Sequence, residues 1–224
     1  MMYSIQCIMP QNRSLCVSKK AILVAEQNDG ETNKNTLYYD QHGNSEIIPC
    51  TRIGEMLSFE YMSKIVFLHE KELLSCLYQA IERSDQNDHW LLHMRKELSK
   101  NCMHNDISLR HIGEIDGVDV GHGVFTEKYI PCGSFIGEYV GLVSSVSETI
   151  TRDNHYNFEY PTCDGSLEIN AREYGNLTRF INHSKNPNAE FKAMSLDDIM
   201  HIICVSVPFT IIILVLLHTN IINL

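Results

Sequence analysis

The stretch Ala171–Asn188 constrains the fold of this chain more than any other, because dense polar residues surround a single apolar pair in it. It reads Ala-Arg-Glu-Tyr-Gly-Asn-Leu-Thr-Arg-Phe-Ile-Asn-His-Ser-Lys-Asn-Pro-Asn, and the pair is Phe180 and Ile181. Polar residues around a buried pair usually form a cap or a ligand pocket. Asn182 offers an amide donor and an acceptor, and His183 offers a ring that titrates near neutral pH. The same residues also fit a solvated turn, so this stretch alone leaves both interpretations open.

A glycine-rich stretch lies about sixty residues upstream, and it reads Gly121-His122-Gly123-Val124-Phe125. The segment Ile130–Gly141 follows it and ends in Gly-Glu-Tyr-Val-Gly. Glycine inside a strand often marks a close approach of the backbone to a ligand, and a simple bulge or hairpin turn is the other interpretation.

The order and spacing of these stretches resemble the SET-domain family of protein methyltransferases, from about Ile107 to Val207. The resemblance implies an α+β, mainly β fold. This is the SET-domain β-fold of short twisted sheets, preceded by a mixed, partly helical N-terminal region. We therefore expect an accessory region at residues 1–105, a SET domain at 106–207 and a hydrophobic, divergent tail at 208–224.

The resemblance also implies a reaction and the residues that serve it. The expected reaction is methyl transfer from S-adenosylmethionine to a lysine of a protein substrate with a histone-like tail. The expected cofactor site comprises Gly121, His122, Gly123, Val124, Tyr156, Asn182 and His183. The expected catalytic residue is Tyr139, which also lines the expected substrate channel together with Phe191. No metal site is expected, since the cofactor itself carries the reactive methyl group.

The chemistry explains these residue types. Methyl transfer from a sulfonium is an in-line displacement, so the main requirement is positioning. The lysine must lose its proton although its reference pKa is about 10.4, and an aromatic, poorly hydrated channel disfavours the ammonium form. Arg179 has two interpretations: it supports the Asn-His turn through charge-assisted hydrogen bonds, or it is a solvated surface charge.

Composition narrows the class of protein. The net charge of −10 argues against a nucleic-acid binder, so no direct nucleic-acid contact is expected. The acidic surface has two interpretations: it attracts a lysine-rich partner, or it serves solubility alone, which is the preferred explanation. The eight cysteines lie at least nine positions apart, which excludes Cys-x-x-Cys zinc pairs and favours reduced thiols in an intracellular, cytoplasmic or nuclear protein. Met1–Pro10 has no basic region, so no secretory signal peptide is expected.

Local patterns predict short elements along the chain. Strands are expected at 21–25, 107–125, 134–143, 154–160 and 201–207, and a hairpin at 37–49 around His42-Gly43-Asn44. Helical spacing from Ser63 to Leu98 predicts two helices, broken at 84–88, the second of which ends near Asn101. His89, His93 and His104 lack ligand spacing with a carboxylate or cysteine, so we interpret them as core or surface residues.

The end of the chain departs from the family pattern. The family implies a closing segment with a tyrosine that faces the channel, but no tyrosine follows Tyr174 and no charged residue follows Asp198. Residues 202–217 form an apolar run of 16 residues, shorter than the about 20 that span a bilayer. Three interpretations stay open for the tail: a transmembrane anchor, a divergent core strand, or the product of a reading-frame change. The alternative function is therefore a truncated, catalytically impaired SET domain that binds at most cofactor or peptide, and membrane association through residues 202–217 is one form that it could take.

Overall fold

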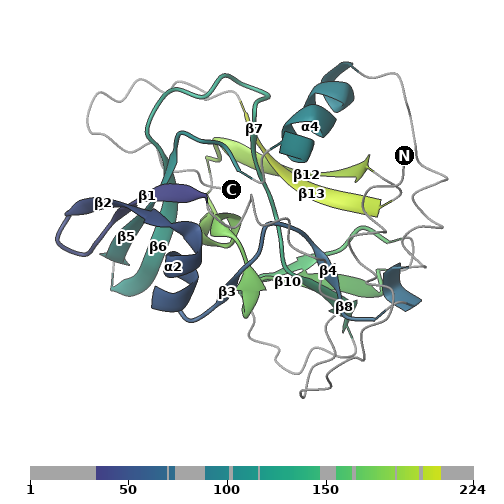
Figure 1. Cartoon of the computed structure of the whole chain (residues 1–224), viewed down its shortest axis with the longest axis horizontal. Helices are drawn as coiled ribbons and strands as arrows, with labels where there is room; N and C mark the ends of the chain where they lie inside the picture. Colours follow the sequence, from purple (N-terminus) through teal and green to yellow (C-terminus); the bar gives the residue numbers. More distant parts are fainter. Residues whose placement is uncertain are drawn as a thin grey trace.

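The computed structural model describes residues 34–69, 71–73, 89–100, 103–115, 117–146, 155–162, 165–184, 186–196 and 199–207. The fold consists mainly of short strands with few helices, which confirms the predicted α+β, mainly β class (Figure 1). In chain order the elements are β1 (Asn35–Tyr39), β2 (Ser45–Pro49), α2 (Cys50–Met56), β3 (Glu60–Tyr61), β4 (Val66–Phe67), α4 (His89–Lys100), β5 (Ile107–Ile115), β6 (Val118–Thr126), β7 (Phe135–Glu138), β8 (Leu142–Ser145), β9 (Asn157–Glu159), β10 (Leu167–Asn170), β11 (Tyr174–Gly175), the 3₁₀ helix η2 (Leu177–Phe180), β12 (Ala189–Leu196) and β13 (Ile199–Ser206).

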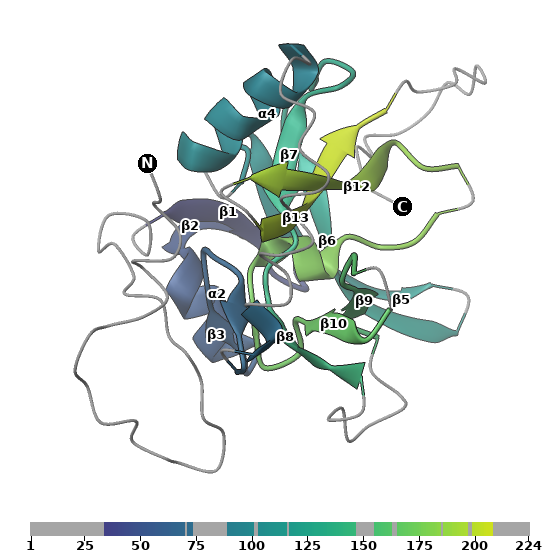
Figure 2. The same cartoon turned by 90° about the vertical axis from the view of Figure 1, so that its right-hand side faces the viewer.

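The described strands form small sheets with the orders β2-β1-β5-β6, β4-β8-β10-β9, β11-β3 and β12-β13-β7. Three of them pair neighbouring strands as well as distant ones, and β11-β3 pairs only strands that are distant in sequence. Helix α4 lies beside β7 in both views and covers the β12-β13-β7 sheet (Figures 1 and 2). Met94, on the apolar stripe of this helix, is fully buried against Phe135 and Ile203. The apolar stripe therefore faces the sheet.

Three of these sheets combine strands from both sides of residue 105. β1 pairs in parallel with β5, β3 with β11, and β4 with β8. The predicted boundary between residues 105 and 106 stays a prediction, but the described strands between residues 34 and 67 share hydrogen-bonded sheets with the later ones. The early segment thus lies where it is able to shape the later site.

Several local predictions are confirmed. β1 and β2 form the expected antiparallel hairpin, and Gly43 at its turn has a φ of +78° that favours glycine. α4 ends at Lys100, as its sequence pattern predicts, and β13 occupies the strand predicted at 201–207. The strand predicted at 21–25 lies outside the described residues, as does most of the first predicted helix.

One of the local predictions is wrong. The segment 63–67, predicted to begin a helix, contains strand β4, because Val66 and Phe67 are fully buried and pair with β8 instead. The strands predicted at 134–143 are present as β7 and β8, of which β7 pairs with β13 and β8 lies between β4 and β10.

Within the apolar run 202–217, the structure describes residues 202–207, which end the central strand β13 of its sheet. Ile202, Ile203 and Cys204 are almost fully buried there. Among the described residues, no helix has the length and apolar character that a membrane crossing needs. The predicted tail, residues 208–224, lies entirely outside the described residues.

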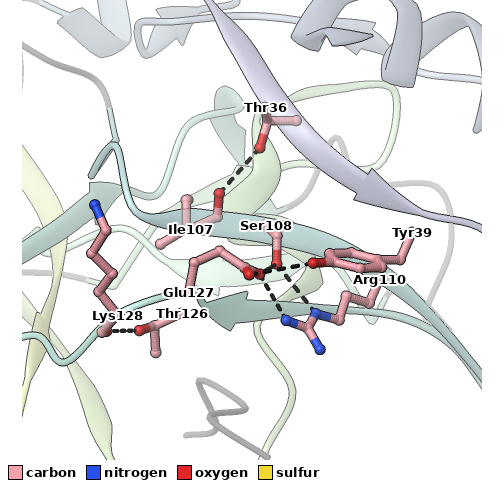
Figure 3. Close-up of polar contacts among 8 residues, drawn as sticks. All are labelled: Thr36, Tyr39, Ile107, Ser108, Arg110, Thr126, Glu127 and Lys128. Atoms are coloured by element: carbon pink, nitrogen blue, oxygen red, sulfur yellow. Dashed lines mark hydrogen bonds and ion pairs between the residues drawn. The ribbon is translucent and has the colours of Figure 1, made fainter. Parts of the chain in front are cut away.

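A polar cluster fastens the β5-β6 hairpin to β1 (Figure 3). The carboxylate of Glu127 accepts hydrogen bonds from the hydroxyls of Ser108 and Tyr39, and forms an ion pair of 2.7 Å with Arg110. The guanidinium carbon of Arg110 lies 4.3 Å from the centroid of the Tyr39 ring and 4.8 Å from that of Phe125. This cluster therefore stabilises the hairpin that carries the Gly-x-Gly stretch.

Glu127→Gln is expected to destabilise the chain at neutral pH and to have little effect in acid. Burial raises the pKa of the Glu127 carboxyl, but hydrogen bonds from Ser108 and Arg110 outweigh it and hold the pKa below its ordinary value of 4.5. A lowered pKa contributes stability above the ordinary value, and this contribution is lost as the pH falls through the lowered one. We expect a loss of up to about 1 kcal/mol in urea denaturation at neutral pH.

The matched control for this prediction is Asp106→Asn, which breaks the more exposed ion pair between Asp106 and Lys128. Because exposed pairs contribute little, this control should cost less than Glu127→Gln at neutral pH. An equal cost of Glu127→Gln at neutral pH and in acid would contradict the assigned pKa shift.

Candidate active site

The first half of the Ala171–Asn188 stretch is a capped 3₁₀ turn fastened to β7. The side chain of Asn176 accepts from the backbone N–H of Thr178 at 2.9 Å and donates to the carbonyl of Glu138 at 2.9 Å. The Thr178 hydroxyl donates to the same carbonyl at 3.1 Å. Asn176 is fully buried, so its side-chain NH2 group and its side-chain oxygen bond to protein groups instead of water. This half of the stretch is a cap, as one of the two interpretations predicts.

In the second half of the stretch, several of the described residues are exposed to solvent. The side chains of His183, Asn186 and Pro187 are exposed, and the hydroxyl of Ser184 accepts from the backbone N–H of Asn186 at 3.1 Å. This local hydrogen bond is typical of a polar turn. The solvated-turn interpretation therefore fits the described residues 183, 184, 186 and 187, and the cap interpretation fits the residues before them.

Asn182 connects the Ala171–Asn188 stretch to the Gly-x-Gly stretch at residues 121–123. Its side-chain amide donates to the backbone carbonyl of His122 at 3.3 Å, across 60 residues of sequence. Gly121, at a register shift between β5 and β6, has a φ of +66°, a conformation that L side chains rarely adopt. Gly123 and Val124 are buried beside it. The structure thus brings the predicted residues 121–124 and 182 together, while the predicted His183 points its side chain to solvent.

The imidazole of His122 packs away from Asn182. Its ring lies 6.0 Å from that of Tyr38, 5.0 Å from that of His111 and 5.9 Å from that of Phe180, measured between centroids. The Tyr38 hydroxyl and Nε2 of His122 are 3.4 Å apart. What His122 presents to Asn182 is therefore its backbone carbonyl, and its side chain packs against β1, β5 and η2.

Gly123→Val is expected to reduce the free energy of cofactor binding more than it reduces the free energy of unfolding. A Cβ at position 123 would lie 3.0 Å from the amide nitrogen of Asn182 and 2.5 Å from the end of the Ile112 side chain. The Ile112 side chain is flexible enough to move, whereas displacement of Asn182 breaks its bond to the Gly-x-Gly stretch. We expect a loss of affinity of about tenfold or more, measured by calorimetry with S-adenosylmethionine.

The double variant Ile112→Ala/Gly123→Val is the control, because it removes the contact with Ile112 and keeps the one with Asn182. Weak binding should persist in it. Full recovery of affinity would show that Gly123 serves only the packing of the hairpin.

The aromatic rings of Tyr139, Phe158 and Phe191 pack against one another. The Tyr139 ring centroid lies 5.6 Å from that of Phe158 and 5.5 Å from that of Phe191, and the last two are 5.3 Å apart. Phe158 and Phe191 are partly exposed, whereas Tyr139 is 6% exposed. Sequence reasoning selected Tyr139 and Phe191 for the channel and missed Phe158. The available signal was the aromatic alternation of Tyr156, Phe158 and Tyr160, of which Tyr160 lies in the core.

The Tyr139 hydroxyl donates to the backbone carbonyl of Tyr156 at 2.7 Å. Burial raises the pKa of Tyr139 well above its ordinary value, although the charge of Arg179 opposes this shift. The hydroxyl therefore stays protonated and remains a donor at physiological pH.

Arg179 is buried, so the interpretation of it as a solvated surface charge is wrong. It is 9% exposed, and its guanidinium carbon lies 4.3 Å from the ring centroid of Phe59, 4.1 Å from that of Tyr156 and 5.0 Å from that of Phe180. Burial lowers the pKa of its guanidinium, and the neighbouring Tyr156 and Tyr139 oppose that shift. Tyr156, predicted for the cofactor site, thus stacks on Arg179 and presents its carbonyl to Tyr139. Sequence reasoning missed Phe59 altogether.

Within the part of the chain that the structure describes, no group of three or more His, Cys, Asp or Glu side chains has the arrangement of a metal site. The described cysteines 50, 132 and 204 are free thiols.

Comparisons with known proteins agree with this geometry. Residues 121–207 match the model of the SET domain family. Mouse (Mus musculus) histone-lysine N-methyltransferase EHMT1 is 43% identical over 72 residues, which cover 31% of this chain and 6% of that protein. The H3 lysine-9 specific histone-lysine N-methyltransferase SUVH5 of Arabidopsis thaliana is 44% identical over 70 residues, covering 30% of this chain and 9% of that protein. The chain therefore spans only a small part of these relatives.

A solved structure of ATXR5 in complex with histone H3.1 is similar over 69% of this chain and 77% of that chain, with a TM-score of 0.53 and 17% sequence identity. At this identity the similarity shows the fold alone. The fold and the paired stretches define the class of SET-domain proteins. Residues 121–207 of this chain are similar to the SET domain of protein lysine methyltransferases, which supports the resemblance seen in the sequence.

Proposed function

We propose that this chain transfers a methyl group from S-adenosylmethionine to a lysine side chain of a histone-like protein. The observation that carries the proposal is the hydrogen bond from Asn182 to the carbonyl of His122, which unites the two stretches that the family resemblance assigns to the cofactor. The relatives EHMT1 and SUVH5 are both named histone-lysine N-methyltransferases, which supports the substrate class and a place of action in chromatin.

The space around two glycines of the Gly-x-Gly stretch supports the assignment of the cofactor to these residues. Beside Gly121 there is open space within 4 Å of the position of a Cβ, and Gly123 lies directly against the amide of Asn182. Backbone without side chains permits the close approach of a large ligand. When bound, S-adenosylmethionine supplies the methyl group on a cationic sulfonium. The backbone of Gly121–Val124 and the side chain of Asn182 would hold it.

The remaining task of the protein is to prepare the lysine. The rings of Tyr139, Phe158 and Phe191 form an apolar cluster against which the lysine stem would pack, and such surroundings disfavour the ammonium form, which promotes loss of the proton. The Tyr139 hydroxyl, held by the carbonyl of Tyr156, adds a fixed polar group at this cluster. Because the reaction is an in-line displacement, fixing these groups lowers the barrier mainly by orientation.

The direct test is incubation of the full chain with methyl-labelled S-adenosylmethionine and mixed core histones. We expect the label in methylated lysine after acid hydrolysis, and a parallel calorimetric titration should show cofactor binding. Asn44→Ala, which changes an exposed hairpin turn, should behave like the parent chain. Cofactor binding without any transfer to histones would favour the alternative, a catalytically impaired SET domain that only binds cofactor, and the absence of both binding and transfer would overturn the proposal.

A further inference from the structure

Phe59 reaches the candidate active site from outside the residues that match the SET-domain model. It lies between α2 and β3, more than sixty positions before residue 121. Its ring centroid is 4.3 Å from the guanidinium carbon of Arg179, and its edge packs on Phe180 at 5.8 Å between centroids. A residue of the N-terminal region therefore contacts the helix η2 that precedes Asn182.

The guanidinium of Arg179 depends on these rings. Its Nε and Nη1 atoms are buried and have no hydrogen-bond partner among the residues that the structure describes. Burial of a charge is costly unless other groups compensate for it. The faces of Phe59 and Tyr156, at 4.3 and 4.1 Å, provide that compensation through cation–π attraction. The position of the guanidinium and the positions of the two rings are therefore interdependent.

The sequence before Phe59 fixes where its ring lies. α2 ends with a hydrogen bond of 2.9 Å from the Leu57 N–H to the carbonyl of Ile53, and Ser58 then has a φ of 60°. The N–H of Phe59 returns to the carbonyl of Gly54 at 2.9 Å. A Cβ on Gly54 would lie 2.5 Å from the carbonyl oxygen of Phe59, so this tight return requires glycine at position 54.

Tyr156 connects this arrangement to the chemistry. One of its faces covers Arg179, and its carbonyl accepts the hydrogen bond of the Tyr139 hydroxyl. The Tyr139 ring in turn contacts Phe158 and Phe191. A displacement of Tyr156 would move the acceptor that orients the Tyr139 hydroxyl.

We propose that Phe59 and Arg179 form a clamp that positions Tyr156 and, through its carbonyl, the hydroxyl of Tyr139. The proposal rests on the proposed function for its consequence, which is that the substrate lysine meets a correctly oriented hydroxyl. Phe59 and Arg179 are positioning residues in this scheme. It gives the segment from α2 to β3 a definite role: the matched region 121–207 is incomplete without it.

The test uses the full chain with a 3-fluorotyrosine label in place of Tyr156, observed by ¹⁹F NMR without cofactor or substrate. In the labelled parent, we expect one resonance shifted by the adjacent guanidinium and aromatic rings. Phe59→Leu and Arg179→Lys should move it towards its position in the unfolded chain and broaden it. Phe59→Tyr, which keeps the ring, should restore the parent signal.

Phe67→Leu is the matched control, because Phe67 is a fully buried ring that packs on Tyr160 in the core. It should leave the resonance of the label at position 156 unchanged. Gly54→Ala gives the same test without touching either clamp residue, and thermal melting of each variant shows which of them fold. If Phe59→Leu does not fold, Arg179→Lys and Phe59→Tyr still test whether Phe59 and Arg179 position Tyr156.

An unchanged resonance in Arg179→Lys, or an equal shift in Phe67→Leu, would overturn the clamp. These outcomes do not depend on turnover, so they separate the clamp from the proposed function. A parent chain that shows the expected resonances but transfers no methyl group counts against the function alone. An active parent whose Phe59 and Arg179 variants leave the label unmoved counts against the clamp alone.

Discussion

Asn182→Ala is expected to bind S-adenosylmethionine about 5- to 150-fold more weakly than the parent chain. The substitution removes the donor that bonds the carbonyl of His122 at 3.3 Å, and with it the hydrogen bond between the residues after η2 and the Gly-x-Gly stretch. Loss of one partner of a partly buried hydrogen bond costs about 1–3 kcal/mol, which corresponds to that range of affinity. Isothermal titration calorimetry measures the loss directly and needs no turnover.

Asn44→Ala provides the matched control for this prediction. Its amide also bonds one acceptor, the carboxylate of Asp40 at 2.9 Å, but it lies on the exposed turn of the β1-β2 hairpin. Its cofactor affinity should equal that of the parent. Equal affinity of Asn182→Ala and Asn44→Ala would remove Asn182 from the cofactor site and leave it as a structural link.

Local sequence patterns predicted the elements that are stabilised by contacts close in sequence. The β1-β2 hairpin follows from Gly43 between two apolar runs, and α4 follows from the apolar spacing of Trp90, Leu91, Met94 and Leu98. The meeting of Gly123 with Asn182 followed from the resemblance to a family, since no periodic pattern joins stretches sixty residues apart.

Two of the three parallel pairings, those of β3 and β4, escaped prediction because these strands are short and their partners are distant in sequence. β3 and β4 have two residues each, and such segments show no alternation that distinguishes them from loops. Their stability comes from partners far along the chain, β11 and β8. The contribution of the early segment to the site was therefore invisible in its own composition.

Arg179 illustrates why a buried charge is hard to recognise in sequence. Its neighbours include Thr178 and Asn182, and a charged residue in a polar stretch usually lies in solvent. Its burial depends on Phe59 and Tyr156, which lie 120 and 23 positions away in the sequence. Only the folded arrangement brings these rings to the guanidinium, and the same arrangement places the Tyr156 carbonyl against Tyr139.

Tyr139→Phe is expected to lower methyl transfer by about 10²- to 10⁴-fold, the usual range for a group that handles or orients a proton. The variant keeps the ring between Phe158 and Phe191 but loses the hydroxyl that donates to Tyr156 at 2.7 Å. Cofactor affinity should change little, because the hydroxyl lies at the aromatic cluster and not at the Gly-x-Gly stretch. Single-turnover transfer from labelled S-adenosylmethionine measures the chemical step apart from product release.

Tyr160→Phe separates this catalytic loss from the loss of a hydrogen bond. The Tyr160 hydroxyl is also buried and also donates to a backbone carbonyl at 2.7 Å, that of Met200, but its ring packs in the core against Phe67. Both variants should lose a similar stability of about 0.5–1.5 kcal/mol in urea denaturation. Only Tyr139→Phe should lose transfer activity. If both variants lose activity in proportion to their stability, Tyr139 is a core residue and its hydroxyl takes no part in the reaction.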